Sequence, residues 1–116
     1  MINMKKLKLL LVVILLQGCG EKPLPPQAEK TGTAEEIIVK SACLACHQDG
    51  NQMQVPTWGD VAKKYKGNQG AEDFLAGKIP HGGAGSWGTM EMPPFVDLTK
   101  AEVRVVVQGI LATPVN

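Results

Sequence analysis

The stretch "SACLACHQDG", residues 41–50, places Cys43 and Cys46 three positions apart and puts His47 directly after the second cysteine. Three side chains this close in sequence can form a disulfide, a thiol redox pair, part of a metal site or an attachment point for a prosthetic group. The rest of the sequence has to decide between these uses.

The pattern Cys-x-x-Cys-His is typical of covalent attachment of a c-type haem. Cys43 and Cys46 can add their thiols to the two vinyl groups at one haem edge, and His47 then lies under the iron as its proximal ligand. Thioredoxin-like cysteines usually begin a helix in a strand-rich fold, whereas these two close a predicted helix and no strand pattern follows. A structural zinc site needs four ligands, and the only other strong candidate, His81, fits no common zinc spacing. The sequence therefore predicts one covalent haem c with its iron on His47.

The first residues have the layout of an export signal. "MINMKKLK", residues 1–8, is basic, and residues 9–16 are apolar, as in a secretory signal peptide. The apolar run is far shorter than the roughly 20 residues that a membrane-spanning helix needs. "LQGC", residues 16–19, resembles the lipobox of bacterial lipoproteins, so we expect residues 1–18 to be a lipoprotein-type signal peptide and Cys19 to carry lipid. Lipidation also explains the odd cysteine count, because it leaves Cys43 and Cys46 as a pair.

The predicted mature chain has two parts. Residues 19–32 are rich in proline and poor in apolar side chains, which predicts a lipid-anchored linker. Residues 33–116 form the predicted folded domain. Removing residues 1–18 takes away three of twelve Lys and Arg residues and leaves nine against eleven acidic residues, a balance that gives no support for nucleic-acid binding. The domain is small, and a large apolar cofactor would enlarge its core.

The fold class predicted for this domain is all-α, with about four short helices wrapped around one haem. Capping boxes at Thr33 and Thr99 begin the first and last helices, which we expect to run to about Cys46 and up to Pro114. "GDVAKKYKG", residues 59–67, and "AEDFLAGKI", residues 71–79, predict the second and third helices, the third being stopped by Pro80. The glycines of residues 82–88 would let the backbone pass close to a flat macrocycle.

Three side chains are candidates for the second axial position of the iron. Met53 is too near His47 to reach the opposite face, which leaves Met90, Met92 and His81. Met92 stands directly before two prolines, which stiffen the backbone and present its thioether at little entropic cost. We therefore favour Met92 and keep the other two as alternatives.

Three segments together resemble the small bacterial class I cytochromes c: "CLACH", "VPTWGDVAKKYKG" and "GSWGTMEMPPF". The resemblance covers the domain from about Thr33 to the last helix and implies that this helix crosses the first. It implies that Met92 is the sixth ligand, that the Pro56 carbonyl accepts the Nδ1–H bond of His47, and that Trp87 lies beside the haem and can bind a propionate. Val55 in place of a common glycine, the Pro80–His81 interruption and the second thioether of Met90 depart from the pattern.

His and Met ligation is suited to passing one electron and leaves no open position for a substrate. We therefore expect a monomeric, membrane-anchored monohaem electron carrier of the bacterial envelope, with its domain in the periplasm and no catalytic activity. Its expected partners are a redox protein donor and acceptor and the membrane that holds its N-terminal lipid, with no nucleic acid and no small-molecule substrate. The alternatives are a haem-c domain that binds ligands as a redox sensor and a dedicated haem subunit of a larger redox enzyme.

Overall fold

The computed structural model describes residues 31–115. Within this range the regular secondary structure is helical, apart from one isolated antiparallel bridge between Gly83 and Met92. The predicted signal peptide, the lipid site at Cys19 and the linker up to residue 30 lie outside the described residues. None of the described helices has the length and apolar character needed to cross a membrane. The helices are α2 (Ala34–Lys40), α3 (Leu44–His47), α4 (Trp58–Tyr65), α5 (Ala71–His81) and α6 (Lys100–Leu111).

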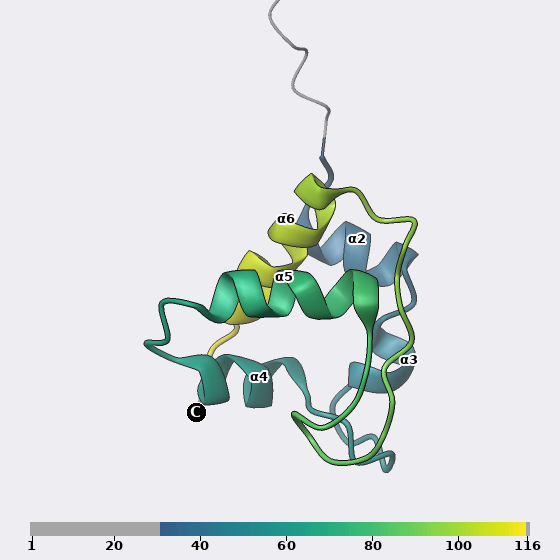
Figure 1. Cartoon of the computed structure of the whole chain (residues 1–116), viewed down its shortest axis with the longest axis vertical. Helices are drawn as coiled ribbons and strands as arrows, with labels where there is room; N and C mark the ends of the chain where they lie inside the picture. Colours follow the sequence, from purple (N-terminus) through teal and green to yellow (C-terminus); the bar gives the residue numbers. More distant parts are fainter. Residues whose placement is uncertain (1–30, 116) are drawn as a thin grey trace, which may run out of the picture.

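Helix α6 is the centre of the fold and contacts α2, α4 and α5 (Figure 1). Its buried side chains recur at helical spacing, and Val107 has no exposed surface at all. They pack with Ile37 and Ile38 of α2, Val61 of α4 and Ile79 of α5. The buried residues of α6 are those expected from its sequence pattern: Val103, Val106, Val107 and Ile110.

The first and last helices cross at a point where both helices carry small residues. A Cβ placed on Gly109 of α6 would overlap the Cβ of Ala34 in α2. Glycine weakens a helix interior by about 1 kcal/mol relative to alanine, so its presence in the middle of α6 needs a packing reason. The reason is this close approach, and the predicted crossing of the two helices is confirmed.

Capping boxes begin three of the helices. Those at Thr33 with Glu36 and at Thr99 with Glu102 were expected from the sequence and are present. A third, between Thr57 and Asp60, begins α4. It escaped the sequence pattern because Asp replaces the usual Glu or Gln at the third helical position.

The predicted helix from Thr33 to about Cys46 is wrong, because α2 ends at Lys40. Ala42 takes a left-handed conformation with φ 55°, and its N–H donates to the Val39 carbonyl oxygen at 3.1 Å. The next N–H, of Cys43, donates to the Ile38 carbonyl oxygen at 3.2 Å. These two bonds form a Schellman motif, which normally has glycine at the left-handed position. Alanine there gives no signal in the sequence, so the break and the separate turn α3 were missed.

The predicted stop at Pro80 is also wrong, because α5 continues through it to His81. Proline removes one backbone donor, and it does so in the last turn, where the loss affects few helical bonds. The helix ends instead at Gly82, which has φ 65° and donates its N–H to the Lys78 carbonyl oxygen at 2.7 Å. The Ile79 carbonyl oxygen accepts the N–H of Phe95 at 2.9 Å, which brings the segment after Met92 against α5.

Candidate haem-binding site

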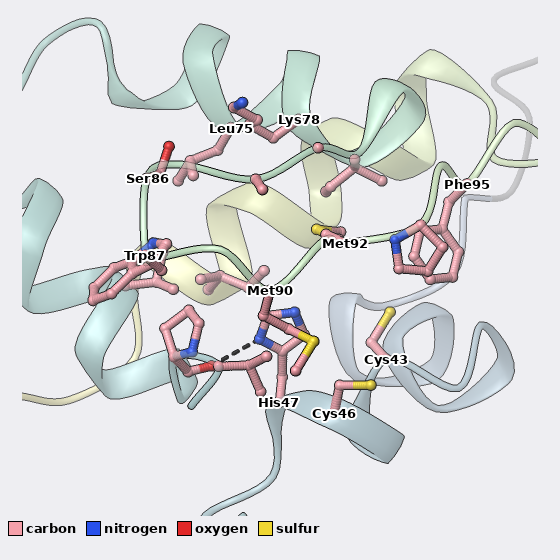
Figure 2. Close-up of a pocket in the computed structure, with 18 of the residues that line it drawn as sticks. Cys43, Cys46, His47, Leu75, Lys78, Ser86, Trp87, Met90, Met92 and Phe95 are labelled. Carbon is pink, nitrogen blue, oxygen red and sulfur yellow. Dashed lines mark hydrogen bonds between the residues drawn. The ribbon is translucent and has the colours of Figure 1, made fainter. Parts of the chain in front are cut away.

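A largely apolar cavity lies between α3, α4, α5, α6 and the segment 83–95 (Figure 2). Cys43, Cys46 and His47 line one part of it, and Met92 lines another. The residues between them are mostly aromatic or aliphatic, and the charged exceptions are Lys78 and Glu91. The apolar walls include Val55, Trp58, Tyr65, Leu75, Phe95 and Val106.

The two cysteines lie about one helical turn apart at α3, and both line the cavity (Figure 2). Cys43 is the N-cap of α3 and Cys46 lies inside it, so the cysteines begin a short helix rather than close a long one, contrary to expectation. Both thiols are free, and no disulfide joins them. Burial raises the pKa of the Cys43 thiol, opposite to the lowered pKa of thioredoxin-like redox pairs. In residues 31–115, no three His, Cys, Asp or Glu side chains group to hold a metal.

The imidazole of His47 is held in one orientation from two sides. Its Nδ1 lies 2.7 Å from the carbonyl oxygen of Pro56, as the resemblance implied. Because a carbonyl oxygen only accepts, Nδ1 carries the proton and Nε2 keeps its lone pair for a metal. The ring also stacks on Trp58, with centroids 4.4 Å apart and planes 19° apart. This arrangement, with the second ring nitrogen bound to a backbone oxygen, is typical of metal-ligating histidines.

The three candidates for the opposite axial position differ in where they lie. Met92 is half-buried, lines the cavity and packs against the core cluster. Met90 also lines the cavity, but 54% of it is exposed. His81 is exposed and is not among the lining residues, and its Nδ1 bonds to the Gly77 carbonyl oxygen of the preceding turn at 2.8 Å. Of the three candidates, Met90 and Met92 therefore lie at the cavity, and His81 lies outside it.

The backbone of Met92 is fixed by the two glycines that follow α5. Gly83 donates its N–H to the Met92 carbonyl oxygen at 2.9 Å and accepts the Met92 N–H at 3.1 Å. Gly82 is buried against the same peptide, and a Cβ there would overlap the Met92 carbonyl oxygen and lie 2.9 Å from the carbonyl carbon of Pro93. Glycine at position 82 therefore makes room for the backbone of Met92.

These residues fit a covalently attached haem. Two free thiols stand one turn apart at the edge of an apolar cavity, and an oriented imidazole with an available Nε2 is the next residue. A thioether on a stiffened segment lines the same cavity. Residues 33–112 match the family model described as cytochrome c.

The chain belongs to the cytochrome c family.

Its relatives are small class I bacterial cytochromes c. Cytochrome c-552 of Hydrogenobacter thermophilus is 44% identical over 78 residues, which cover 67% of this chain and 79% of the relative. Cytochrome c-551 of Azotobacter vinelandii is 35% identical over 79 residues, 68% of this chain and 95% of the relative. The crystal structure of wild-type Nitrosomonas europaea cytochrome c552 aligns with a TM-score of 0.60 at 36% identity, covering 66% of this chain and 95% of that one. The chain is therefore a monohaem c-type cytochrome, with one covalent haem c and its iron.

The mouth of the cavity in this cytochrome carries residues that the sequence pattern did not all single out. Trp87, expected beside the haem, lines the cavity and is 37% exposed. Lys64 lies against it, with its Nζ 4.1 Å from the centroid of the Trp87 ring. Lys78 lines the cavity from α5 and was missed, because a lone lysine in a helical pattern gives no sign of whether it faces a cofactor or water.

Proposed function

We propose that this cytochrome carries single electrons between redox proteins of the bacterial envelope, with His47 and Met92 as the axial ligands of its haem. The observation that carries the ligand assignment is the pairing of Met92 with Gly83, which fixes the thioether-bearing residue at the cavity that His47 also lines. The side chains of His47 and Met92 are both drawn at this cavity in Figure 2.

The haem would supply a one-electron couple for exchange with a donor and an acceptor protein. The protein's part is to hold, orient and insulate that centre. Cys43 and Cys46 attach it, and His47 presents Nε2 because Pro56 holds Nδ1. Met92 would supply the second protein ligand of the iron, which would leave no position for a substrate, and a thioether ligand would favour the reduced iron.

The cavity also has a place for the charged edge of the group. A haem has two propionates, and burying a carboxylate without a partner is costly. Lys78 is the one lysine or arginine among the side chains that line the cavity, and it is half-buried. We assign Lys78 to a propionate, together with the indole N–H of Trp87.

The envelope location and the anchor rest on the sequence before residue 31. Residues 1–18 would direct export and be removed, and Cys19 would then carry the lipid that holds the domain at a membrane. Residues 19–32 would separate the domain from that membrane as a proline-rich linker. A redox protein on each side of the reaction would complete the route, and we infer that the domain acts as a monomer without a substrate of its own.

The visible spectrum of the purified holoprotein tests this function. A methionine–iron charge-transfer band in the red region of the ferric spectrum, together with a pyridine haemochrome spectrum of one haem c, is the expected result. A high-spin ferric spectrum with ready binding of cyanide or carbon monoxide would instead support the ligand-binding sensor. Met90 gives that alternative a structural basis, because its thioether lines the same cavity as Met92.

A further inference from the structure

Lys64 of α4 reaches across to the tip of the loop formed by residues 83–91. Its Nζ donates a hydrogen bond to the carbonyl oxygen of Ser86 and also lies 4.1 Å from the ring centroid of Trp87. One lysine therefore makes a polar contact and a cation–π contact with two successive residues. An exposed lysine on a helix is ordinarily solvated, and no pattern in the sequence indicates this contact of Lys64.

The tip that Lys64 contacts has little packing of its own. Gly85 and Gly88 flank Ser86 and Trp87 with φ values of 100° and 102°, and the Gly85 N–H donates to the Gly88 carbonyl oxygen at 2.8 Å. A Cβ added at either glycine would meet nothing within 4 Å, so the tip stands clear of the helices here. Glycine-rich backbone loses much conformational entropy on ordering, and an ordered tip therefore needs a contact from elsewhere.

The base of the same loop is fixed independently, by the two hydrogen bonds between Gly83 and Met92. Lys64 contacts Ser86 and Trp87, which lie at the tip of the loop and not at this base. Loss of the lysine is therefore expected to loosen the tip and leave the base, including Met92, in place.

We propose that Lys64 is a positioning residue that holds Trp87 against the mouth of the haem cavity and so limits the access of water to the haem there. Lys64 does not itself line the cavity, whereas Ser86 and Trp87 do, so it acts through them. Solvent exposure is one of the factors that set the reduction potential of a haem, because water stabilises the more charged oxidised state. The inference goes beyond the proposed electron-carrier role and requires the haem c of the family, whichever methionine is the sixth ligand.

The chain contains a matched control for the charge. A lysine near the haem could raise the potential simply as a cation, without positioning anything. Lys63 is the neighbouring residue on α4 and is exposed like Lys64. Within residues 31–115, no hydrogen bond or ring contact joins its side chain to the loop. Lys63→Met and Lys64→Met therefore remove the same charge, but only the second removes the contacts.

The experiment compares the wild-type holoprotein with Lys63→Met, Lys64→Met and Lys64→Arg. Hydrogen exchange of the Trp87 indole N–H and of the amides at residues 86–88 is measured by NMR in the reduced protein, beside the midpoint potential. Because Lys64→Met loses two weak surface contacts, we expect hydrogen exchange at the tip to be roughly fivefold faster than in wild type. Exchange at the amides of Gly83 and Met92 should change little. The potential should fall further in Lys64→Met than in Lys63→Met, and Lys64→Arg, which can make both contacts, should resemble wild type.

Equal exchange at the tip in Lys63→Met and Lys64→Met would overturn the proposal, as would equal shifts of the potential, which would reduce Lys64 to a charge. A Lys64→Arg protein that exchanges as fast as Lys64→Met would also contradict it. The ferric charge-transfer band is recorded on the same samples, so that a failure of the Met92 assignment is seen separately from a failure of this inference.

Discussion

Gly83 and Met92 donate their N–H groups to each other's carbonyl oxygens, at 2.9 and 3.1 Å, within the non-helical segment that joins α5 to α6. The two residues are nine positions apart in the sequence, and they bracket the glycine-rich loop that follows α5. Because Pro93 and Pro94 follow at once, the backbone around Met92 is restrained on both sides. The thioether at the cavity is therefore presented by an ordered main chain, and this relationship underlies the first two predictions.

Replacing Met92 by alanine should remove the sixth ligand while the haem stays attached. We expect loss of the ferric charge-transfer band, binding of cyanide or carbon monoxide, and a lower midpoint potential, because the sulfur that favours ferrous iron is gone. Met90→Ala is the matched control and should retain the band and nearly the native potential. The opposite pair of results would transfer the ligand to Met90.

Replacing Gly82 by alanine should displace Met92 without touching any side chain of the site. The new Cβ would overlap the Met92 carbonyl oxygen, and the residue has a left-handed φ of 65°. We expect a weakened charge-transfer band and a loss of about 1–3 kcal/mol of unfolding free energy, measured by denaturant titration of the holoprotein. Gly85→Ala has the same kind of backbone strain, with open space around its Cβ, and should keep the band.

Replacing Gly109 by alanine should separate α2 from α6, because the added methyl group would overlap Ala34. Overpacking of this kind typically costs about 1–3 kcal/mol. Gly77→Ala, in α5, adds the same methyl group where nothing lies within 4 Å, and its better helix propensity should stabilise the protein by up to about 1 kcal/mol. Thermal or denaturant unfolding of both holoproteins measures the contrast, and equal destabilisation of the two would refute the crossing argument.

Replacing both Cys43 and Cys46 by alanine should abolish covalent haem and, with it, most of the tertiary structure. The cavity occupies the space between the helices, and a domain of this size has little core to spare. Haem staining after denaturing electrophoresis and far-ultraviolet circular dichroism are the measurements. A soluble double mutant with native helix content would show that the helices pack without the cofactor.

Replacing Cys19 by serine should release the cytochrome from the membrane fraction and leave its visible spectrum unchanged. Stable anchoring takes more than one acyl chain, and the lipid on this cysteine would supply them. Fractionation of cells that express wild type and Cys19→Ser gives the answer. If the variant remains fully bound to the membrane, residues 9–16 act as part of an uncleaved anchor.

The haem c could be predicted from the sequence because its attachment signature is local. Cys43, Cys46 and His47 lie within five consecutive residues, and the Nδ1 of His47 lies against the Pro56 carbonyl oxygen as expected. The capping boxes at Thr33 and Thr99 could also be predicted, because each threonine and its glutamate partner are only three residues apart. In each case the deciding interaction lies within one helical turn.

What the sequence did not reveal depends on backbone conformation or on distant neighbours. Ala42 ends α2 in a conformation that usually calls for glycine, so the break between α2 and α3 was hidden. Pro80 could be tolerated because it falls in the final turn of α5, a position known only once the end of the helix is known. The contact between Lys64 and Trp87 joins segments that no local pattern relates.

The two sides of the haem cavity would be joined to the cofactor by different kinds of bond. Cys43 and Cys46 lie before α4 and would form covalent bonds, whereas Met92 lies beyond α5 and would hold the iron by a single coordinate bond, as proposed. The coordinate bond would close a loop running from residue 47 to residue 92, and the entropy cost of closing a loop rises only slowly with its length. A transient departure of the segment around Met92 would therefore leave the haem in place, and its return would be an intramolecular event at high effective concentration. The molecule can thus recover from partial unfolding without having to recapture its cofactor.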